Sequence, residues 1–229
     1  MGIGTKPRFQ QAVSWSPQIA DSRLARWFPE LQDIMNPRPD PRLLNIWADV
    51  RELTRIANSA ATNKAFVTES QFRYITTSLP YRLVHLEFEP GSPSEVLRLC
   101  LLAYTKSLLI QAKGLGKNMT YLSTRLESSI RAWMPRVPRG SPVLLWVLFM
   151  SSIAIFEDMP ADPDWLRCSL VQEMTTQRSW PETLSVLSDF LWVHALHNRR
   201  GEELFTELTA IAANQARVPT VDPLHLTLL

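Results

Sequence analysis

The stretch Val143–Phe156 is the most apolar part of this sequence, and it limits the fold most strongly. It holds 14 residues, of which only Ser151 and Ser152 are polar. A bilayer span needs about 20 apolar residues, so the stretch is too short to cross a membrane. A helix that is apolar on every side must instead have protein neighbours on most of them. The sequence therefore predicts a buried helix surrounded by other helices, and no membrane span.

The remainder of the sequence has the periodicity of amphipathic helices. Hairpin dipeptides such as Asn-Gly and Asp-Gly are absent, and no run alternates apolar and polar residues with a period of two. Apolar residues recur three and four positions apart, as in Leu43, Ile46, Val50, Leu53 and Ala57. The breaks come from 17 prolines rather than from the 7 glycines. We predict helices at 17–28, 43–60, 68–79, 94–112, 118–134, 142–156, 163–177, 180–196 and 201–216.

Several predicted helices have marked starts. Ser141-Pro142 and Asp162-Pro163 place an N-cap residue before a proline at the first helical position. In a capping box, the residue at the cap and the residue three positions later each satisfy the other's backbone N–H. This spacing occurs at Thr68 and Gln71, Ser92 and Glu95, and Ser179 and Glu182.

These patterns predict one all-α domain with a central pair of helices. A second segment, Val96–Tyr104, is also apolar nearly all round. We expect this segment and 142–156 to form the centre of a single globular domain, wrapped by the amphipathic helices. Residues 1–42 are interpreted as an N-terminal helix with a proline-rich linker, 43–217 as the helical domain, and 218–229 as a flexible tail.

The net charge, the cysteines and the N-terminal residues bear on what this protein binds and where it is located. The net charge of +2, from 24 basic and 22 acidic side chains, predicts no direct binding to nucleic acid or anionic lipid. Cys100 and Cys168 lie within apolar helical patterns, so we expect both to be buried and not to form a disulfide. Residues 1–10 lack the apolar core of a signal peptide, which predicts an intracellular protein.

Three sequence patterns suggest chemistry but fall short of a site. His194 and His197 share a helical face, but Cys100 or Glu202 would have to complete a metal site, so structural histidines are favoured. Residues 114–117, Gly-Leu-Gly-Lys, lack the glycine and the hydroxyl of a phosphate-binding loop. An acidic loop, Glu157-Asp158 and Asp162–Asp164, is explained by a helix start. We therefore predict no catalytic residue, no metal ligand and no cofactor.

Aromatic residues give the one candidate binding surface. Phe190–Val193 places four large side chains in a row, and four consecutive helical positions point around the whole helix. Packing against a second layer of helices would account for this, and so would a ligand or a partner. The candidate surface for a small apolar ligand or a protein partner comprises Trp146, Met150, Phe190, Trp192 and His194. We expect Trp146 and Trp192 to be largely buried.

A resemblance extends over the region from about Phe66 to Leu208. The residues that carry it are Gln71–Tyr74, Leu79–Leu83, Glu95–Tyr104, Pro142–Ala154, Trp165, Ser179–Glu182 and Phe190–Trp192. In this order they resemble the regulatory region of fungal zinc-cluster transcription factors. That family carries a six-cysteine zinc cluster near its N-terminus, whereas this sequence has no cysteine before Cys100. The resemblance therefore implies a regulatory domain without the DNA-binding module in this sequence.

The resemblance implies a nuclear domain that controls transcription through protein partners or a small apolar ligand. Two alternatives remain open. The same helical fold could serve as a metal-free enzyme of fungal secondary metabolism, in which case a cytoplasmic location fits better. It could also serve as a scaffold that forms a homodimer or pairs with a full-length relative.

Zinc and DNA provide a first test. We predict that the purified chain carries no stoichiometric zinc, because two cysteines cannot build a zinc cluster. We also predict no duplex binding that persists at physiological salt, because the charges nearly cancel. Elemental analysis and a salt titration of DNA binding measure these two properties. One zinc ion per chain, or salt-resistant specific binding, would contradict the interpretation.

Overall fold

The structure, a computed structural model, confirms the all-α fold. It describes residues 40–63, 68–69, 73, 77–109, 120–156, 163–174 and 179–217. Within these residues the regular elements are helices, and no strand occurs. None of the described helices is both long enough and apolar enough to span a bilayer. The predicted helix at 17–28 and the predicted tail at 218–229 lie outside the described residues.

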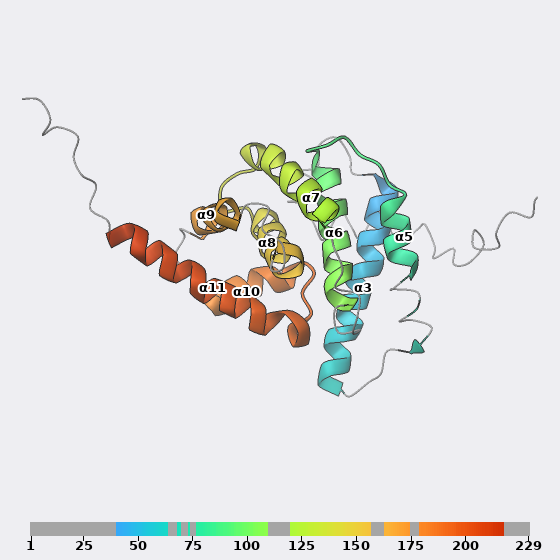
Figure 1. Ribbon diagram of the computed structural model, residues 1–229. Helices are drawn as coiled ribbons and strands as arrows, with labels where there is room; N and C mark the ends of the chain where they lie inside the picture. Colours follow the sequence, from blue (N-terminus) through green and yellow to red (C-terminus); the bar gives the residue numbers. More distant parts are fainter. Residues whose placement is uncertain are drawn as a thin grey trace, which may run out of the picture.

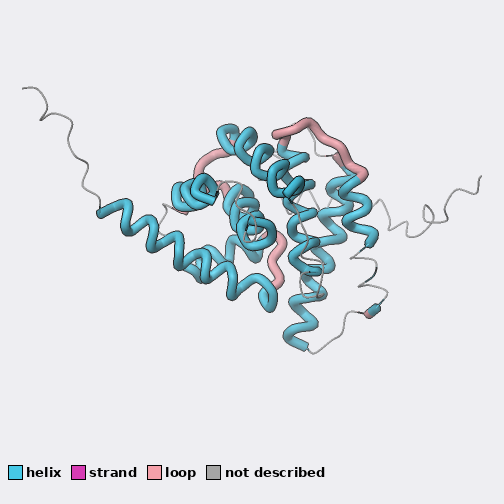
Figure 2. The backbone as a smooth tube through the Cα atoms, viewed as in Figure 1, coloured by secondary structure: helices cyan, strands magenta, loops and turns pink. Residues whose placement is uncertain are grey.

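The helices surround α8 and α6. In chain order the elements are α3 (Pro41–Asn63), α5 (Leu79–Val84), α6 (Pro93–Leu109), α7 (Thr120–Trp133), the 3-10 turn η4 (Met134–Arg136), α8 (Pro142–Ser151), the π-helical η5 (Ser152–Phe156), α9 (Pro163–Glu173), α10 (Trp180–Asp189) and α11 (His194–Arg217). α3 and α5 lie on one side of α6, and α8 with α9, α10 and α11 lies on the other (Figure 1). The longest described loop joins α5 to α6 (Figure 2).

The helix α8 forms the centre that the apolar stretch predicts. Its residues Val143–Ser151 are all buried. Neighbours on several sides make this possible, because α6, α9 and α10 all pack against α8. Ser141 caps the helix, and its hydroxyl accepts from the Leu144 N–H at 3.5 Å. Pro142 occupies the first helical position, where a missing N–H costs no hydrogen bond.

The second central helix, α6, begins with a buried ion cluster. The Ser92 hydroxyl accepts from the Glu95 N–H at 3.2 Å, as in a capping box. The Glu95 carboxylate does not complete the box, because it is fully buried and takes charged partners instead. Arg98 donates to both of its oxygens at 2.7 Å, and Arg125 of α7 donates to one at 2.8 Å. The cluster fixes α6 to α7.

One predicted helix end was wrong because of a proline. The sequence predicts a helix over 68–79 that stops before Pro80. In the structure α5 runs through Pro80 to Val84, and this proline occupies its second position. A proline in the first turn of α5 loses no hydrogen bond, so Pro80 does not end the helix. Leu79 and Leu83 are the buried residues of α5.

The predicted helices 180–196 and 201–216 were divided at the wrong place. The chain leaves α10 at Asp189 and starts α11 at His194, so Phe190–Val193 form a non-helical connector. Gly201, the predicted first residue of the last helix, lies inside α11. A Cβ atom there would lie 2.7 Å from the Trp180 ring and 2.8 Å from the Trp192 ring. The glycine is therefore needed for the close approach of two tryptophans.

The prediction for Cys168 was also wrong. Cys100 is buried as expected, but Cys168 is exposed. On α9 the buried residues Leu166 and Leu170 mark the inner face. Cys168 is two residues from each of them, about 200° around the helix, and therefore points outward. The prediction of burial rested on the apolar residues of this helix and did not take account of the face on which Cys168 lies.

Gly201→Ala tests the close packing against α11. Helix propensity alone would favour alanine by about 1 kcal/mol. We expect the opposite sign, a loss of about 1–3 kcal/mol, because the new methyl group overlaps both indole rings. Urea unfolding measures the difference. Thr209→Ala, at an exposed position of α11, serves as the control. An increase in stability for Gly201→Ala would contradict the described packing.

Candidate functional site

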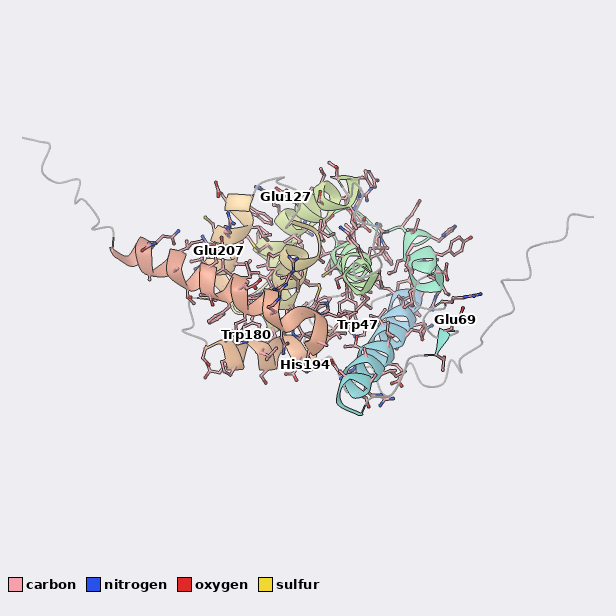
Figure 3. The ribbon with its side chains drawn as sticks, turned by 60° about the horizontal axis from the view of Figure 1, so that its bottom comes forward. Trp47, Glu69, Glu127, Trp180, His194 and Glu207 are labelled. Atoms are coloured by element: carbon pink, nitrogen blue, oxygen red, sulfur yellow. The ribbon has the colours of Figure 1, made fainter. Side chains whose placement is uncertain are left out.

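The structure buries four of the five residues of the predicted binding surface and exposes the fifth. Trp146 and Met150 of α8 are 0% exposed, and Phe190 and Trp192 of the connector are 7% and 1% exposed. His194 is exposed at the start of α11, so it is not part of the buried core. Figure 3 shows it at the end of α11 that faces α3. The expected burial of Trp146 and Trp192 is confirmed.

The connector explains the row of four large side chains. We expected Phe190–Val193 to point around a helix, but these residues are not helical, and all four are buried. Outside a helix, successive side chains are not forced 100° apart, so one core can receive all of them. The Trp146 ring packs against Phe190 at 6.0 Å and against Trp47 of α3 at 5.4 Å, between ring centroids. The structure gives these aromatic residues a packing role.

Side chains from other helices satisfy the backbone of the connector. The Trp146 indole N–H donates to the Leu191 carbonyl at 3.0 Å. Asn58 of α3 makes two bonds: its amide N–H donates to the Trp192 carbonyl at 2.8 Å, and its oxygen accepts from the His194 N–H at 2.9 Å. A buried backbone group without a partner would destabilise the fold. The Asn58 side chain therefore makes the hydrogen bonds that the connector backbone cannot make within a helix.

His197 holds the connector from the α11 side. The Val193 N–H donates to its Nδ1 atom at 3.0 Å, so this nitrogen carries no hydrogen. The neutral ring then carries its hydrogen on Nε2, which donates to the Ser107 hydroxyl at 3.0 Å. Ser107 in turn donates to the Tyr104 carbonyl at 2.6 Å. Burial, and secondarily the nearby His194, lowers the His197 pKa from 6.5 to about 4, so the ring is neutral near pH 7.

The serine–histidine pair has the wrong hydrogen arrangement for catalysis. A general base needs an unprotonated nitrogen facing the nucleophile. In this structure the unprotonated nitrogen of His197 faces the Val193 N–H, and its protonated nitrogen faces Ser107. The Ser107 proton is directed to a backbone carbonyl. The pair therefore joins α6 to α11 rather than activating a serine.

A second buried hydrogen bond joins α6 to α3. The Tyr104 hydroxyl lies 2.5 Å from the Thr54 hydroxyl, and Thr54 donates to the Val50 carbonyl at 2.8 Å. Burial raises the pKa of Tyr104, so the phenol stays neutral. The Tyr104 ring also contacts the His197 ring at 5.6 Å between centroids. Thr54, Tyr104 and His197 thus connect three helices through one network.

Sequence reasoning missed the polar members of this network. Thr54 and Asn58 sit one turn apart on α3, beside the apolar stripe that ends in Leu53 and Ala57. Polar residues that border such a stripe indicate a buried hydrogen bond. That signal was present in the sequence. Their partners, Tyr104 and Trp192, lie 50 and 134 residues away, and no local pattern identifies them.

The other sequence candidates do not converge. Among the residues that the structure describes, no three His, Cys, Asp or Glu side chains gather as a metal site would require. Both ring nitrogens of His197 already have partners. Residues 114–117 and the acidic residues 157, 158 and 162 lie outside the described residues.

The described surface presents its large apolar side chains mainly on α5. Tyr81 is 66% exposed and Val84 is 61% exposed, and their spacing of three residues puts them on one face of α5. We call these two residues the α5 face. Beside it, an ion pair between Arg82 and Asp49 fixes α5 to α3. The other large exposed apolar residue in the described part is Tyr121, on α7.

Comparisons with known proteins identify no relative. No family model, no curated protein and no solved structure matches this chain.

The hydrogen bonds of His197 predict a loss of stability in acid. The unfolded chain binds a proton at this ring near pH 6.5, whereas the folded chain does so only near pH 4. The stabilisation is complete above pH 6.5 and is lost as the pH falls to about 4, a difference of roughly 3 kcal/mol. Urea unfolding at a series of pH values measures it. His197→Asn should flatten the pH dependence, and His194→Gln should leave most of it. An unchanged profile for His197→Asn would contradict the assignment.

Proposed function

We propose that this chain is a regulatory helical domain that controls transcription by binding a protein partner. The proposal rests first on the resemblance to the regulatory region of fungal zinc-cluster transcription factors. The proposal includes a nuclear location. The stretches that carry this resemblance, such as Glu95–Tyr104 and Pro142–Ala154, supply much of the buried core, and so they bear on the fold rather than on the partner.

The α5 face is the observation that supports a protein partner. It belongs to Leu79–Val84, most of which is part of the resemblance. Leu79 and Leu83 turn inward, while Tyr81 and Val84 turn outward. Tyrosine is enriched at protein interfaces, where its ring buries a large area and its hydroxyl remains hydrated. Two large exposed side chains on one helical turn form an anchor of this kind.

The alternatives have less support from the described residues. The Ser107–His197 pair is directed away from nucleophilic chemistry, as its hydrogen bonds require. Burial raises the pKa of the Cys100 thiol, which opposes formation of a reactive thiolate. A small apolar ligand would have to displace packed side chains around Trp146, which is fully buried. A dimerising scaffold would also need an exposed apolar face. A purified chain that forms a homodimer would favour this alternative over a domain that binds a different protein.

A reporter assay in a fungal host tests the proposal. The chain, fused to a heterologous DNA-binding domain, should change transcription of a reporter that carries the matching sites. Val84→Asp should return the reporter to its basal level, because a carboxylate on the α5 face would be desolvated in any apolar interface. Tyr121→Ser, at an exposed apolar position on α7, should leave the output unchanged.

Two further readings make the assay decisive. The thermal unfolding of both variants should match the parent chain, because both positions are exposed. A fusion that leaves the reporter at its basal level would argue against a regulatory domain. A Val84→Asp variant with full output would remove the α5 face from the mechanism.

A further inference from the structure

We propose that the α5 face binds a segment of another protein in which an arginine adjoins a large apolar side chain. The inference rests on the proposed function, because it names the chemistry of the partner at the same surface. It is drawn from the position of α5 in the fold, from a stack of two rings on this helix, and from the carboxylates that follow it.

The α5 face lies on a side of α5 that no other described helix covers. α5 packs against α3 and α6, which both lie on its inner side (Figure 1). The Arg82–Asp49 ion pair fixes α5 to α3. Arg98 of α6 donates to the Leu83 carbonyl at 3.1 Å and fixes the end of α5 to α6. A partner therefore meets an ordered surface, which lowers the entropic cost of binding.

A stack of two rings extends the α5 face. The Tyr81 and His85 rings lie 4.0 Å apart between centroids, with an interplanar angle of 39°. The His85 Nδ1 atom is 2.8 Å from the Tyr81 carbonyl oxygen, which only accepts, so this nitrogen carries the hydrogen. In the neutral ring, Nε2 is then a hydrogen-bond acceptor, and His85 is exposed. An arginine suits this arrangement, because a guanidinium group stacks on aromatic rings and donates hydrogen bonds at the same time.

Two carboxylates lie on the outer side of the chain directly after α5. In this non-helical stretch Leu86 is buried and Phe88 is half-buried, whereas Glu87 and Glu89 are exposed. The alternation puts both carboxylates on one side of the chain, about 7 Å apart along an extended backbone. Figure 2 shows this loop leaving the end of α5. Neither carboxylate has an ion pair with a described residue.

The carboxylates also lie close to the apolar part of the face. Glu87 is three residues from Val84, so their α carbons are at most about 11 Å apart. A segment that buries an apolar side chain against Val84 can therefore place a neighbouring cation beside Glu87 and the ring stack. Such a match of apolar and charged groups is typical of a protein interface.

The sign of this charge selects the class of partner. Nucleic acid and anionic lipid carry phosphates, which the two carboxylates repel. A second copy of this chain, docked through the same face about a two-fold axis, would bring its own Glu87 and Glu89 to the interface. A protein segment with an arginine beside an apolar residue meets no such repulsion. Arginine fits better than lysine, because its planar group can stack on the Tyr81 and His85 rings.

Selection from a phage library of short random peptides tests the inference on the full chain. The library is first passed over the Val84→Asp variant, which removes peptides that bind elsewhere, and then over the parent chain. We expect the retained peptides to be enriched in arginine next to a large apolar residue. Retained peptides that are acidic or uncharged, or the retention of none, would overturn the inference.

A matched pair of charge reversals shows whether Glu87 and Glu89 select the arginine. The double variant Glu87→Lys, Glu89→Lys should bind the retained peptides at least about tenfold more weakly by fluorescence anisotropy, because like charges then meet. The double variant Glu202→Lys, Glu203→Lys makes the same change of charge at exposed positions of α11 and should keep the parent affinity. Circular dichroism shows that both remain folded. Parent affinity in the first variant, or an equal loss in the second, contradicts the inference.

The stacking of the arginine is tested within the peptide. Replacing the arginine of a retained peptide by lysine keeps the charge but removes the planar group. We expect the affinity to fall about threefold to tenfold. A lysine peptide that binds as tightly would show that charge alone suffices and would remove the ring stack from the inference.

Two further readings separate this inference from the other occupant and from the proposed function. A parent chain that sediments as a dimer, with a monomeric Val84→Asp variant, would assign the α5 face to a second copy and overturn the inference. A reporter that depends on Val84, with retained peptides that lack arginine, would overturn the inference and leave the proposed function standing. A silent reporter with arginine peptides bound at the α5 face would give the reverse result.

Discussion

The complete burial of α8 is the constraint on which the rest of this structure depends. A helix whose residues Val143–Ser151 are all buried cannot lie on the surface of a single layer. It needs neighbours on several sides, and α6, α9 and α10 provide them, together with Trp47 of α3. α6 is apolar enough to serve as the second central helix, so that α3, α5 and α7 can pack on its other sides. The layered arrangement follows from one helix that has no polar face.

The α10–α11 connector is buried in this core, and its backbone needs hydrogen-bond partners. The four buried residues Phe190–Val193 have a non-helical backbone, and a buried backbone outside a helix requires hydrogen-bond partners. Asn58, Trp146 and His197 supply these partners from three different helices. The polar groups of these three side chains therefore already have hydrogen-bond partners within the fold. For this reason His197, which suggested a metal site, stabilises the packing of the helices, and the functional hypothesis concerns the surface instead.

The candidate site could be predicted from the sequence only in part. The burial of Trp146 and Trp192 was predicted correctly, because large apolar side chains at helical spacing indicate a core. The interpretation of the aromatic residues as a surface depended on a helix through Phe190–Val193, which does not form. The α5 face escaped notice because Pro80 suggested the end of a helix. Tyr81 and Val84 count as exposed only once Leu79 and Leu83 are known to face inward.

The sequence by itself determined the helical class, the two central helices and several helix starts. These features depend on local causes, namely apolar periodicity, N-cap residues and proline in the first turn. Tertiary structure alone decided where α10 ends, why Gly201 lies within a helix, and how Glu95 and His197 are used. Those outcomes depend on groups distant in the sequence: the indole rings that require Gly201 to lack a side chain, Arg125 for Glu95, and Ser107 for His197. A local pattern contains no information on such partners, because burial is known only after the helices have packed.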